Sequence, residues 1–485
     1  MECADWYSFR CSRKKYRKGV VLYGIGSSRA YAGLTRRPRR QASFMFFAAG
    51  LATFVAGLPG CGGRTNSAPS PSPQNPLSQK IQHVVVVVQE NRSTDNLFHG
   101  LAGADIANEG VNSQGQVIPL TPLPLANDYD LSHNHQAFVA MYDGGRMDGA
   151  DKVLVGCVSG AVGCPPPNPQ FKYVNPSDVA PYFQLAEQYT FADRMFQTNQ
   201  GPSFPAHQFI ISGTSAPTAT SIYYAAEDPV TPAGASEVGC DAPANSYVLL
   251  IDPSGVESSK QFPCFEHPTV VDLLDSRTIS WRYYTPMPGS LWTSPNAIQH
   301  LRFGPDWSAN VINSATQVLS DISNGELPRV SWVIPTGQSS DHASSNDGSG
   351  PSWVASIVNA VGNSPYWSTT AIFIVWDDWG GWYDHVAPPI YNSYEYGFRV
   401  PLIVVSPYAK QHYVSHVTHD FGSILRFIEK DFNLSSLGYA DARADDLSDC
   451  FDLSQSPVAF RSIPAKHDAS FFFNDRRPPT PPDDD

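Results

Sequence analysis

Two pairs of residues with metal-binding side chains closely follow apolar runs, and they are the strongest candidates for chemistry in the sequence. The pairs are Glu90 with Asn91, after the run 84–88, and Asp377 with Asp378, after the run 372–376. Carboxylates crowded in one cleft resist ionisation unless a cation lies among them. Oxygen ligands of this kind suit a divalent metal. The two pairs together therefore predict a metal site, whereas the alternative for either pair alone is a cap on the helix that follows it.

The apolar runs that precede these acids have the character of buried strands. They are unbroken and rich in β-branched residues, which is typical of parallel strands covered on both faces. Further runs occur at 279–284, 330–334 and 400–405, and helical spacing occurs at 351–361 and after Asp420. The sequence therefore predicts an α/β fold with a mostly parallel central sheet sandwiched by helices. In such folds ligands bind beyond the carboxyl ends of the strands, where the acids stand.

The composition and the charge exclude several classes of protein. The 485 residues are 42% hydrophobic and 16% charged, which provides for a large core and disfavours a disordered or coiled-coil chain. The net charge is −13, but residues 1–44 carry 11 basic and two acidic residues, so the remainder carries −22. A body of that charge repels nucleic acid, because binding to phosphates depends on Lys and Arg.

The first eighty residues have the features of an export segment and a tether. The uncharged stretch 44–58 follows an arginine cluster and is too short to span a bilayer, which is typical of a secretory signal. The residues that end this stretch and continue to Cys61 resemble a lipoprotein cleavage box. We expect residues 1–61 to be an export segment and 62–80 a Ser/Pro-rich linker. The protein is then exported and is periplasmic, extracellular or anchored to the cell envelope through a lipidated Cys61.

The rest of the chain is predicted to form one catalytic domain, 81–470, and a disordered acidic tail, 471–485. Two local disulfides are expected in Pro/Gly-rich loops, namely Cys157 with Cys164 and Cys240 with Cys264. The alternative is a set of five partly buried thiols, and Cys450 has no assigned partner in either case. Cysteine and histidine spacings typical of a structural zinc site do not occur.

Six stretches, taken in order, resemble the phosphoesterase family that contains bacterial non-specific phospholipases C and a group of acid phosphatases. They include the strings ENRSTDNLF, GPSFP and YDHVAPP, and the likeness spans roughly residues 81–435. One such motif is weak evidence, whereas six in the family's order are specific. The stretches are 81–98, 130–133, 145–149, 191–205 with 212–214, 327–332 with 341–342, and 364–389.

The resemblance implies an alkaline-phosphatase-like fold and a metal-assisted hydroxyl nucleophile. Ser203 in the string GPSFP stands where the family has its nucleophile, which is also a ligand of one divalent metal ion. The other implied ligands are the two acidic pairs already named. Attack on phosphorus would form a phosphoseryl intermediate, and histidines would neutralise phosphoryl oxygens and protonate the leaving alkoxide. The implied histidines are His133, His342 and, in third place, His385.

Departures from the family pattern affect the choice of substrate. Thr94, Ala150, Ala206 and His207 replace residues usual in the phospholipases C, and we assign the changes at 206–207 to the pocket wall rather than to the metal ligands. Ser203 favours a phosphomonoesterase, whereas Phe204 and Pro205 favour a phospholipase.

Two rival functions remain at this point. A secreted serine esterase of the α/β-hydrolase type would need a G-x-S-x-G pentapeptide, which the sequence lacks. A non-catalytic polymer-binding protein would use some of the 22 Tyr and 10 Trp to stack on sugars, although core packing also accounts for these aromatic residues.

Overall fold

The computed structural model describes residues 77–480, and its main sheet is mostly parallel. The sheet has eight strands in the order β13-β12-β14-β1-β15-β16-β8-β17. Five of its seven strand pairs are parallel, which confirms the predicted fold class. The strands are β1 His83–Gln89, β8 Thr190–Ala192, β12 Trp281–Thr285, β13 Val311–Asn313, β14 Val330–Val333, β15 Thr370–Trp376, β16 Leu402–Val405 and β17 Tyr413–Ser415.

Strand β16 differs from the prediction in its direction. The run 400–405 was expected to be parallel like the others, but β16 pairs antiparallel with both β15 and β8. All four residues of β16 are buried. An unbroken apolar run indicates that both faces of a strand are buried. Both parallel and antiparallel strands can be buried in this way.

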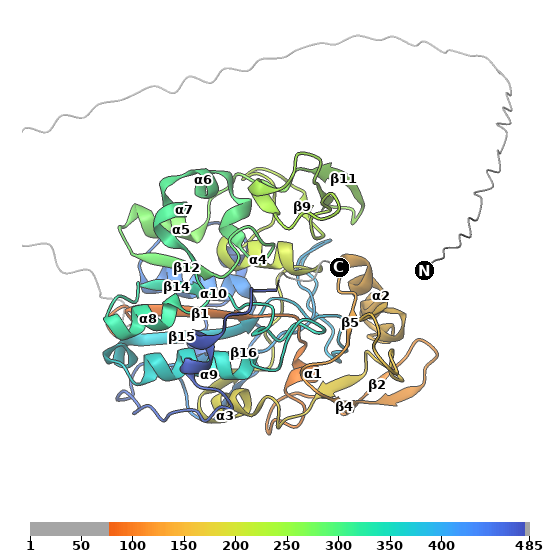
Figure 1. Cartoon of the computed structure of the whole chain (residues 1–485), viewed down its shortest axis with the longest axis horizontal. Coiled ribbons are helices and arrows are strands. Elements are labelled where there is room, and N and C mark those ends of the chain that lie inside the picture. The colour runs from red at the N-terminus through yellow and green to blue at the C-terminus, as the bar shows by residue number, and fades with distance from the viewer. Residues whose placement is uncertain (1–76, 481–485) are drawn as a thin grey trace, which may run out of the picture. The chain divides into compact units, whose positions relative to one another are not determined.

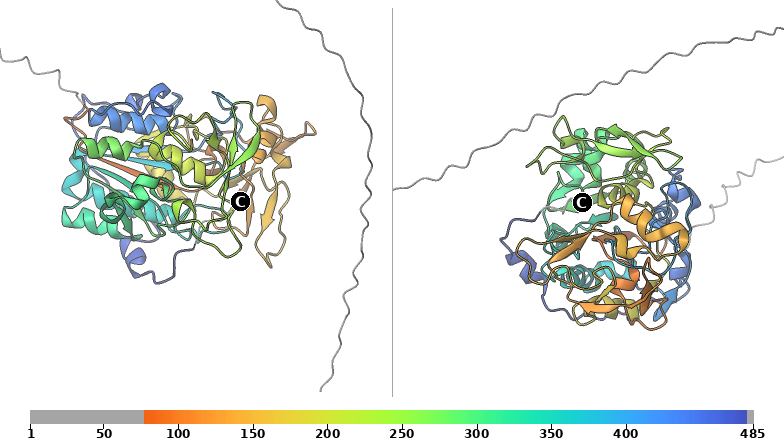
Figure 2. Two further views of the ribbon diagram at one scale, coloured as in Figure 1. Left: turned by 90° about the horizontal axis from the view of Figure 1, so that it is seen from above. Right: turned by 90° about the vertical axis from the view of Figure 1, so that its right-hand side faces the viewer.

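Helices cover both faces of the main sheet, as Figures 1 and 2 show. Helices α8 and α9 lie on one face, and α10 lies on the opposite face in the left view of Figure 2. Helices α9 and α10 are the two that the sequence predicted. The helices are α1 Thr94–Leu97, α2 His135–Tyr142, α3 Ala180–Gln188, α4 Ser203–Ser212, α5 Val270–Ser276, α6 Gln299–Phe303, α7 Pro305–Asn310, α8 Gln317–Asn324, α9 Gly350–Gly362, α10 Phe421–Asp431, α11 Ala440–Arg443 and α12 Ala469–Asn474.

Smaller sheets stand apart from the main sheet, and Figure 1 shows β2, β4 and β5 beyond one end of its strands. The sheet pairings are β2 with β3, β4 with β7, β5 with β6, and the order β11-β10-β9. Their strands are β2 Glu109–Val111, β3 Val117–Pro119, β4 Thr121–Leu123, β5 Tyr129–Leu131, β6 Val155–Cys157, β7 Lys172–Val174, β9 Tyr224–Ala225, β10 Val248–Ile251 and β11 Glu257–Gln261. Six short 3₁₀ helices complete the secondary structure: η1 Asp143–Gly145, η2 Ala150–Lys152, η3 Gly239–Asp241, η4 Ser294–Ala297, η5 Pro365–Thr369 and η6 Ser448–Cys450.

The core is built around the central strands β1 and β15. Every residue of β15 is buried, and the five valines of β1 are fully buried. A second, smaller apolar cluster includes Phe138, Trp379, Trp382 and Phe398. Trp379 and Trp382 lie in the loop that follows β15, so this cluster packs against the residues next to the carboxyl end of that strand. The loops that carry the candidate site therefore have an apolar support of their own.

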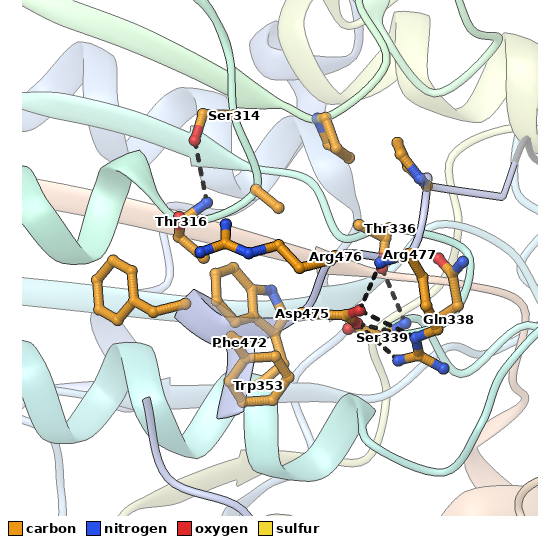
Figure 3. A pocket seen from close by; sticks show the side chains of 14 residues that line it. Ser314, Thr316, Thr336, Gln338, Ser339, Trp353, Phe472, Asp475, Arg476 and Arg477 are labelled. Carbon is orange, nitrogen blue, oxygen red and sulfur yellow. Dashed lines mark hydrogen bonds and ion pairs between the residues drawn. The ribbon is translucent and has the colours of Figure 1, made fainter. Parts of the chain in front are cut away.

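The C-terminal segment is ordered further than the sequence predicted. The disordered tail was expected from 471, but α12 continues to Asn474 and the described residues run to 480. Figure 3 shows a pocket between this segment and the loops that follow β12, β13 and β14. Its volume is about 280 Å³. Arg477 forms an ion pair with Asp347, and the Thr480 amide donates to Gln338 Oε1 at 3.1 Å. The segment is thus fastened onto the loop that carries Asp341 and His342.

Disulfides link Cys157 to Cys164 and Cys240 to Cys264, and Cys450 is a buried free thiol. The expected export segment, Cys61 and most of the linker lie outside the described residues. Within residues 77–480, none of the helices has the length and apolar character that a membrane span requires.

Candidate functional site

The neighbouring parallel strands β1 and β15 bring Glu90 and Asn91 close to Asp377 and Asp378. In β1 and β15, Gln89 stands opposite Trp376, so the residues that follow leave the sheet side by side. The amide of Asp377 donates to the Gln89 carbonyl at 3.0 Å, and the amide of Asn91 donates to Asp377 Oδ1 at 3.0 Å. Glu90, Asn91, Asp377 and Asp378 are all fully buried. The structure therefore places these four residues as the sequence predicted.

Ser203 is the first residue of α4 and points at the acids. Its hydroxyl donates to Asp378 Oδ2 at 3.1 Å, and the residue is 2% exposed. The amide of Phe204 in the first turn donates to Asp228 Oδ1 at 2.8 Å, which anchors the start of the helix. The same Asp378 oxygen lies 3.4 Å from the side-chain nitrogen of Asn91. One carboxylate thus connects the expected nucleophile with the expected metal ligands.

His207 also reaches this cluster, a position that the sequence did not predict. We had assigned it to the pocket wall, whereas its Nε2 lies 3.4 Å from Glu90 Oε2 and 3.7 Å from Asp377 Oδ2. Ser203 and His207 are four residues apart on α4 and therefore share one helix face. That spacing is a signal in the sequence, but it brings the two side chains together only if the segment is helical, which the apolar pattern of 203–212 does not predict.

The cluster fits a cation because several of its buried polar atoms have no hydrogen-bond partner within residues 77–480. These atoms are Glu90 Oε1, Asn91 Oδ1, Asp377 Oδ2 and His207 Nδ1. Burial, followed by the charge of Asp377, raises the pKa of Glu90 well above its usual value. Burial lowers the pKa of His207 to about 4, so the imidazole is neutral at neutral pH. One ligand atom each from Glu90, His207 and Asp377 lie within 4.8 Å of one another, as a shared ion requires.

His133 and His342 lie beside each other at the same edge. Their ring centroids are 5.8 Å apart. His133 Nδ1 lies 2.8 Å from the Leu131 carbonyl, so Nδ1 carries the proton and Nε2 accepts from the Asn91 side chain at 2.7 Å. His342 Nδ1 donates to the Ala343 carbonyl at 2.7 Å, which leaves its Nε2 for exchange of a proton with a ligand. The structure thus brings His133 to the acidic cluster and places His342 beside His133.

His385 belongs to a different cluster. Its Nδ1 lies 2.7 Å from Asp95 Oδ2 and its Nε2 3.1 Å from Asp105 Oδ1. Burial lowers the pKa of His385, but the hydrogen bond and the charge of Asp95 outweigh this effect and raise it to about 9. Asp95, Asp384 and His385 also have the spacing of metal ligands, but the Arg399 guanidinium already bonds both carboxylates, at 2.9 and 3.0 Å. A fixed cation therefore neutralises this second cluster.

We expect Arg399→Met to lower the free energy of unfolding by about 3–5 kcal/mol, because it removes the guanidinium that bonds the two buried carboxylates Asp95 and Asp384. Arg399, Asp95 and Asp384 are all fully buried. Urea denaturation of the variant measures the change. Arg302→Met is the matched control, since it breaks a partly exposed pair with Asp241 and should cost about 0–1 kcal/mol. Equal losses for both variants would contradict this account.

Gly380 allows the loop after β15 to pack against the metal-binding loop. Its φ is +62°, and a Cβ there would overlap the carbonyl of Asn91, which itself has a φ of 60°. We expect Gly380→Ala to destabilise the protein by about 1–3 kcal/mol and to displace Asn91, because strain and overlap add at this position. Gly115→Ala is the control, since Gly115 also has positive φ but open space around it. Thermal unfolding and metal titration of both variants check the prediction, and a smaller loss for Gly380→Ala would contradict it.

A second serine, Ser415, has a triad-like setting that does not support a serine esterase. His419 Nε2 lies 3.1 Å from Ser415 Oγ, and its Nδ1 lies 2.6 Å from Asp445 Oδ1. However, the Ser415 hydroxyl donates to Asp449 at 2.6 Å, and both Ser415 and His419 are fully buried. A catalytic serine donates to its histidine and is open to substrate. These contacts instead fasten β17 to the segment around residues 445–449.

Comparisons with known proteins agree with the resemblance in sequence. The chain is 25% identical to the non-hemolytic phospholipase C of Pseudomonas aeruginosa over 73% of this chain and 54% of that protein. It is 24% identical to phospholipase C B of Mycobacterium tuberculosis, with 89% of this chain and 88% of that protein covered. It is 26% identical to non-specific phospholipase C6 of Arabidopsis thaliana, with 76% and 72% covered. The chain spans little more than half of the length of the non-hemolytic phospholipases C that it matches.

Among solved structures, an alkaline-phosphatase-superfamily protein from Vibrio parahaemolyticus aligns with 75% of this chain and 70% of its own. Its sequence identity is 11% and its TM-score is 0.34, a likeness too weak to carry an argument.

The model of the phosphoesterase family matches residues 81–435. This match covers β1 with Glu90, the start of α4 with Ser203, and β15 with Asp377, so it includes the whole candidate site. The chain belongs to the phosphoesterase family.

Proposed function

We propose that the protein is a metal-dependent phosphoesterase that hydrolyses phosphate esters through a phosphoseryl intermediate on Ser203. The observation that carries the proposal is the position of the Ser203 hydroxyl, 3.1 Å from Asp378 in a buried cluster with unpartnered oxygen atoms. Family membership and the relatives named phospholipase C support the same reaction class.

The ligands of one divalent ion would be Glu90, Asn91, Asp377, Asp378 and Ser203. When bound, such an ion makes a serine hydroxyl more acidic and withdraws charge from a phosphoryl oxygen. The protein's own part is to fix the hydroxyl, because the hydrogen bond to Asp378 and the anchored start of α4 set its direction. The Ser203 hydroxyl gives its proton to Asp378, which accepts its hydrogen bond, and the oxygen forms a bond to phosphorus while the bond to the leaving alkoxide breaks. Water hydrolyses the resulting phosphoserine in a second displacement.

His342 is the better placed of the two neighbouring histidines to protonate the leaving group. Its Nδ1 is used by Ala343, so its Nε2 can carry a proton to the alkoxide oxygen. His133 instead accepts from Asn91 through Nε2 and thereby orients the amide, so that Asn91 Oδ1 is free to face the ion. We therefore assign proton transfer to His342 and positioning of the ligand to His133. The expected catalytic role of His385 has less support, because it is paired with Asp95 and Asp105.

The substrate is a phosphate ester, and its class stays open between a phosphomonoester and a phospholipid. Phospholipase C relatives support the second, and Ser203 in place of Thr supports the first. A polymer-binding function has little support, because eight of the nine tryptophans within residues 77–480 are buried and cannot stack on a sugar. Export, with anchoring through Cys61, is part of the proposal and concerns residues that the structure does not describe.

Turnover of p-nitrophenyl phosphate with and without a chelator tests this function. We expect hydrolysis that the chelator stops and a divalent ion restores. A parallel assay with p-nitrophenyl acetate separates a phosphoesterase from a serine esterase, since only the latter hydrolyses the carboxyl ester without metal. A panel of phosphatidylcholine and sugar phosphates then distinguishes the two substrate classes. Hydrolysis of the carboxyl ester alone, or of none of these esters, would overturn the proposal.

A further inference from the structure

We propose that His207 is a nitrogen ligand of the metal ion, so that the site prefers transition metals such as Mn²⁺, Fe²⁺, Co²⁺ or Zn²⁺ over Mg²⁺ and Ca²⁺. The inference rests on the proposed function only for the presence of an ion. It adds one ligand to the five expected from the sequence and gives the site a mixed nitrogen and oxygen donor set.

The distances around His207 are those of ligands that share an ion. Its Nε2 lies 3.4 Å from Glu90 Oε2 and 3.7 Å from Asp377 Oδ2, which is longer than a good hydrogen bond. Two atoms that each lie about 2.1 Å from one ion are about 3.0–3.4 Å apart at octahedral or tetrahedral angles. The shorter separation thus falls at the upper limit of this range, and the longer one needs a shift of a few tenths of an ångström.

A purely structural histidine would show a different pattern of contacts. A buried histidine that only packs normally satisfies its ring nitrogens with protein groups. Within the described residues, His207 Nδ1 has no hydrogen-bond partner, and Nε2 faces only the two carboxylates, although the residue is fully buried. Within the described residues, the polar contacts of the ring are therefore limited to these two carboxylates.

The backbone of His207 is held firmly enough to aim the ring. The Ser294 hydroxyl donates to the His207 carbonyl at 2.6 Å, and the amide of Phe204 one turn earlier is fixed by Asp228. Ser203 on the same helix face contacts Asp378. Helix α4 therefore presents the nucleophile and the imidazole to the same cluster as one rigid unit.

The choice of metal follows from the donor set. Mg²⁺ and Ca²⁺ bind oxygen ligands, whereas imidazole suits Zn²⁺, Fe²⁺ and other transition ions. Replacement of His207 by Gln offers an amide oxygen in place of the ring nitrogen and leaves an all-oxygen site. This variant should lose affinity for Mn²⁺ and Zn²⁺ and should retain its weaker affinity for Mg²⁺ and Ca²⁺.

The test compares wild type, His207→Gln and His207→Ala, with His267→Gln as the control. His267 is also buried, and its ring nitrogen contacts the Pro268 carbonyl rather than the acidic cluster. Calorimetric titration of the metal-free proteins with Mn²⁺, Zn²⁺, Mg²⁺ and Ca²⁺ gives the dissociation constants. Pulsed electron paramagnetic resonance of the Mn²⁺-loaded proteins reports directly whether a nitrogen atom is bound. Circular dichroism in chelator shows that each variant is folded.

In the paramagnetic resonance spectra we expect the Mn²⁺ electron spin to couple to a ligand nitrogen in wild type and in His267→Gln. This coupling should be lost in both His207 variants. The Mn²⁺ dissociation constant should rise about 10–100-fold on His207→Gln, with little change for Mg²⁺. Wild-type Mn²⁺ binding without nitrogen coupling, or equal Mn²⁺ affinities in wild type and His207→Gln, would overturn the inference and leave the proposed function standing. Absence of metal binding in wild type would overturn both.

Discussion

Ser203→Ala should lower kcat for p-nitrophenyl phosphate by about 10³-fold or more while the protein stays folded and binds metal. The reason is that the hydroxyl is the attacking group, and loss of a nucleophile removes the covalent route altogether. Among residues 77–480 the hydroxyl makes one hydrogen bond, to Asp378 at 3.1 Å, so its removal should cost at most about 1–2 kcal/mol of stability. Steady-state kinetics and urea denaturation of the same preparation separate the two effects.

Ser212→Ala is the matched control for this variant. Ser212 is fully buried on the same helix, nine residues further along α4, and its hydroxyl has no hydrogen-bond partner within residues 77–480. We expect its kcat to stay within about twofold of wild type, because the change removes the same atom without touching the site. Comparable activity in Ser203→Ala and Ser212→Ala would show that Ser203 is not the nucleophile.

Asp377→Asn should have opposite effects on stability with and without metal. In chelator the variant should be more stable than wild type, because one of the mutually repelling buried carboxylates becomes neutral. Asp377 and Glu90 are both fully buried, and the charge of Asp377 contributes to the raised pKa of Glu90. With Mn²⁺ present, wild type should gain stability and the variant should gain little, since its metal affinity falls at least about 100-fold. Thermal unfolding at fixed protein concentration measures all four conditions.

Asp384→Asn distinguishes the metal site from the second acidic cluster. Asp384 is also fully buried, but it bonds Arg399 at 2.9 Å. We expect this variant to be less stable than wild type both with and without metal, and to show the full stabilisation by Mn²⁺. Loss of the Mn²⁺ stabilisation in Asp384→Asn, together with full Mn²⁺ stabilisation in Asp377→Asn, would place the ion in the other cluster and contradict our assignment.

The acidic pairs were predictable because strand ends of a parallel sheet meet at one edge. Unbroken valine-rich runs identified β1 and β15, and Glu90 and Asp377 follow them directly, so little beyond the adjacency of the strands had to be assumed. Ser203 and His133 came from motif position alone, because Ser203 begins α4 and His133 follows β5, and the apolar pattern does not fix the path of the loops on which these positions depend. Their distance from the strands became known only with the structure.

The errors have physical causes that can be stated residue by residue. The direction of β16 was wrong because burial on both faces does not report direction. His207 was placed outside the ligand set because helix α4 contains Pro205 and its apolar residues show no clear face, so its periodicity was not recognised. The tail was expected to be disordered from its prolines, but Phe472 and Arg477 hold it to the protein body through apolar contact and an ion pair.

The net charge of the protein indicates that a local cation is needed to attract an anionic substrate. Residues 45–485 carry a net charge of −22, which includes the carboxylates of the site, so an anionic phosphate ester is repelled at long range. Attraction must be local, and the groups available for it are the bound ion and the histidines His133 and His342. We therefore expect this cluster to hold a phosphoryl group only when the cation is present.

The most direct test of the central claim is mass spectrometry of the protein after acid quenching during turnover of a phosphate ester. The account predicts that the peptide containing Ser203 carries one phosphoryl group on that residue, that the signal requires metal, and that it is absent in Ser203→Ala. A metal-dependent turnover with no phosphorylation of Ser203 under any quench condition, or with the phosphoryl group on another residue, would contradict it.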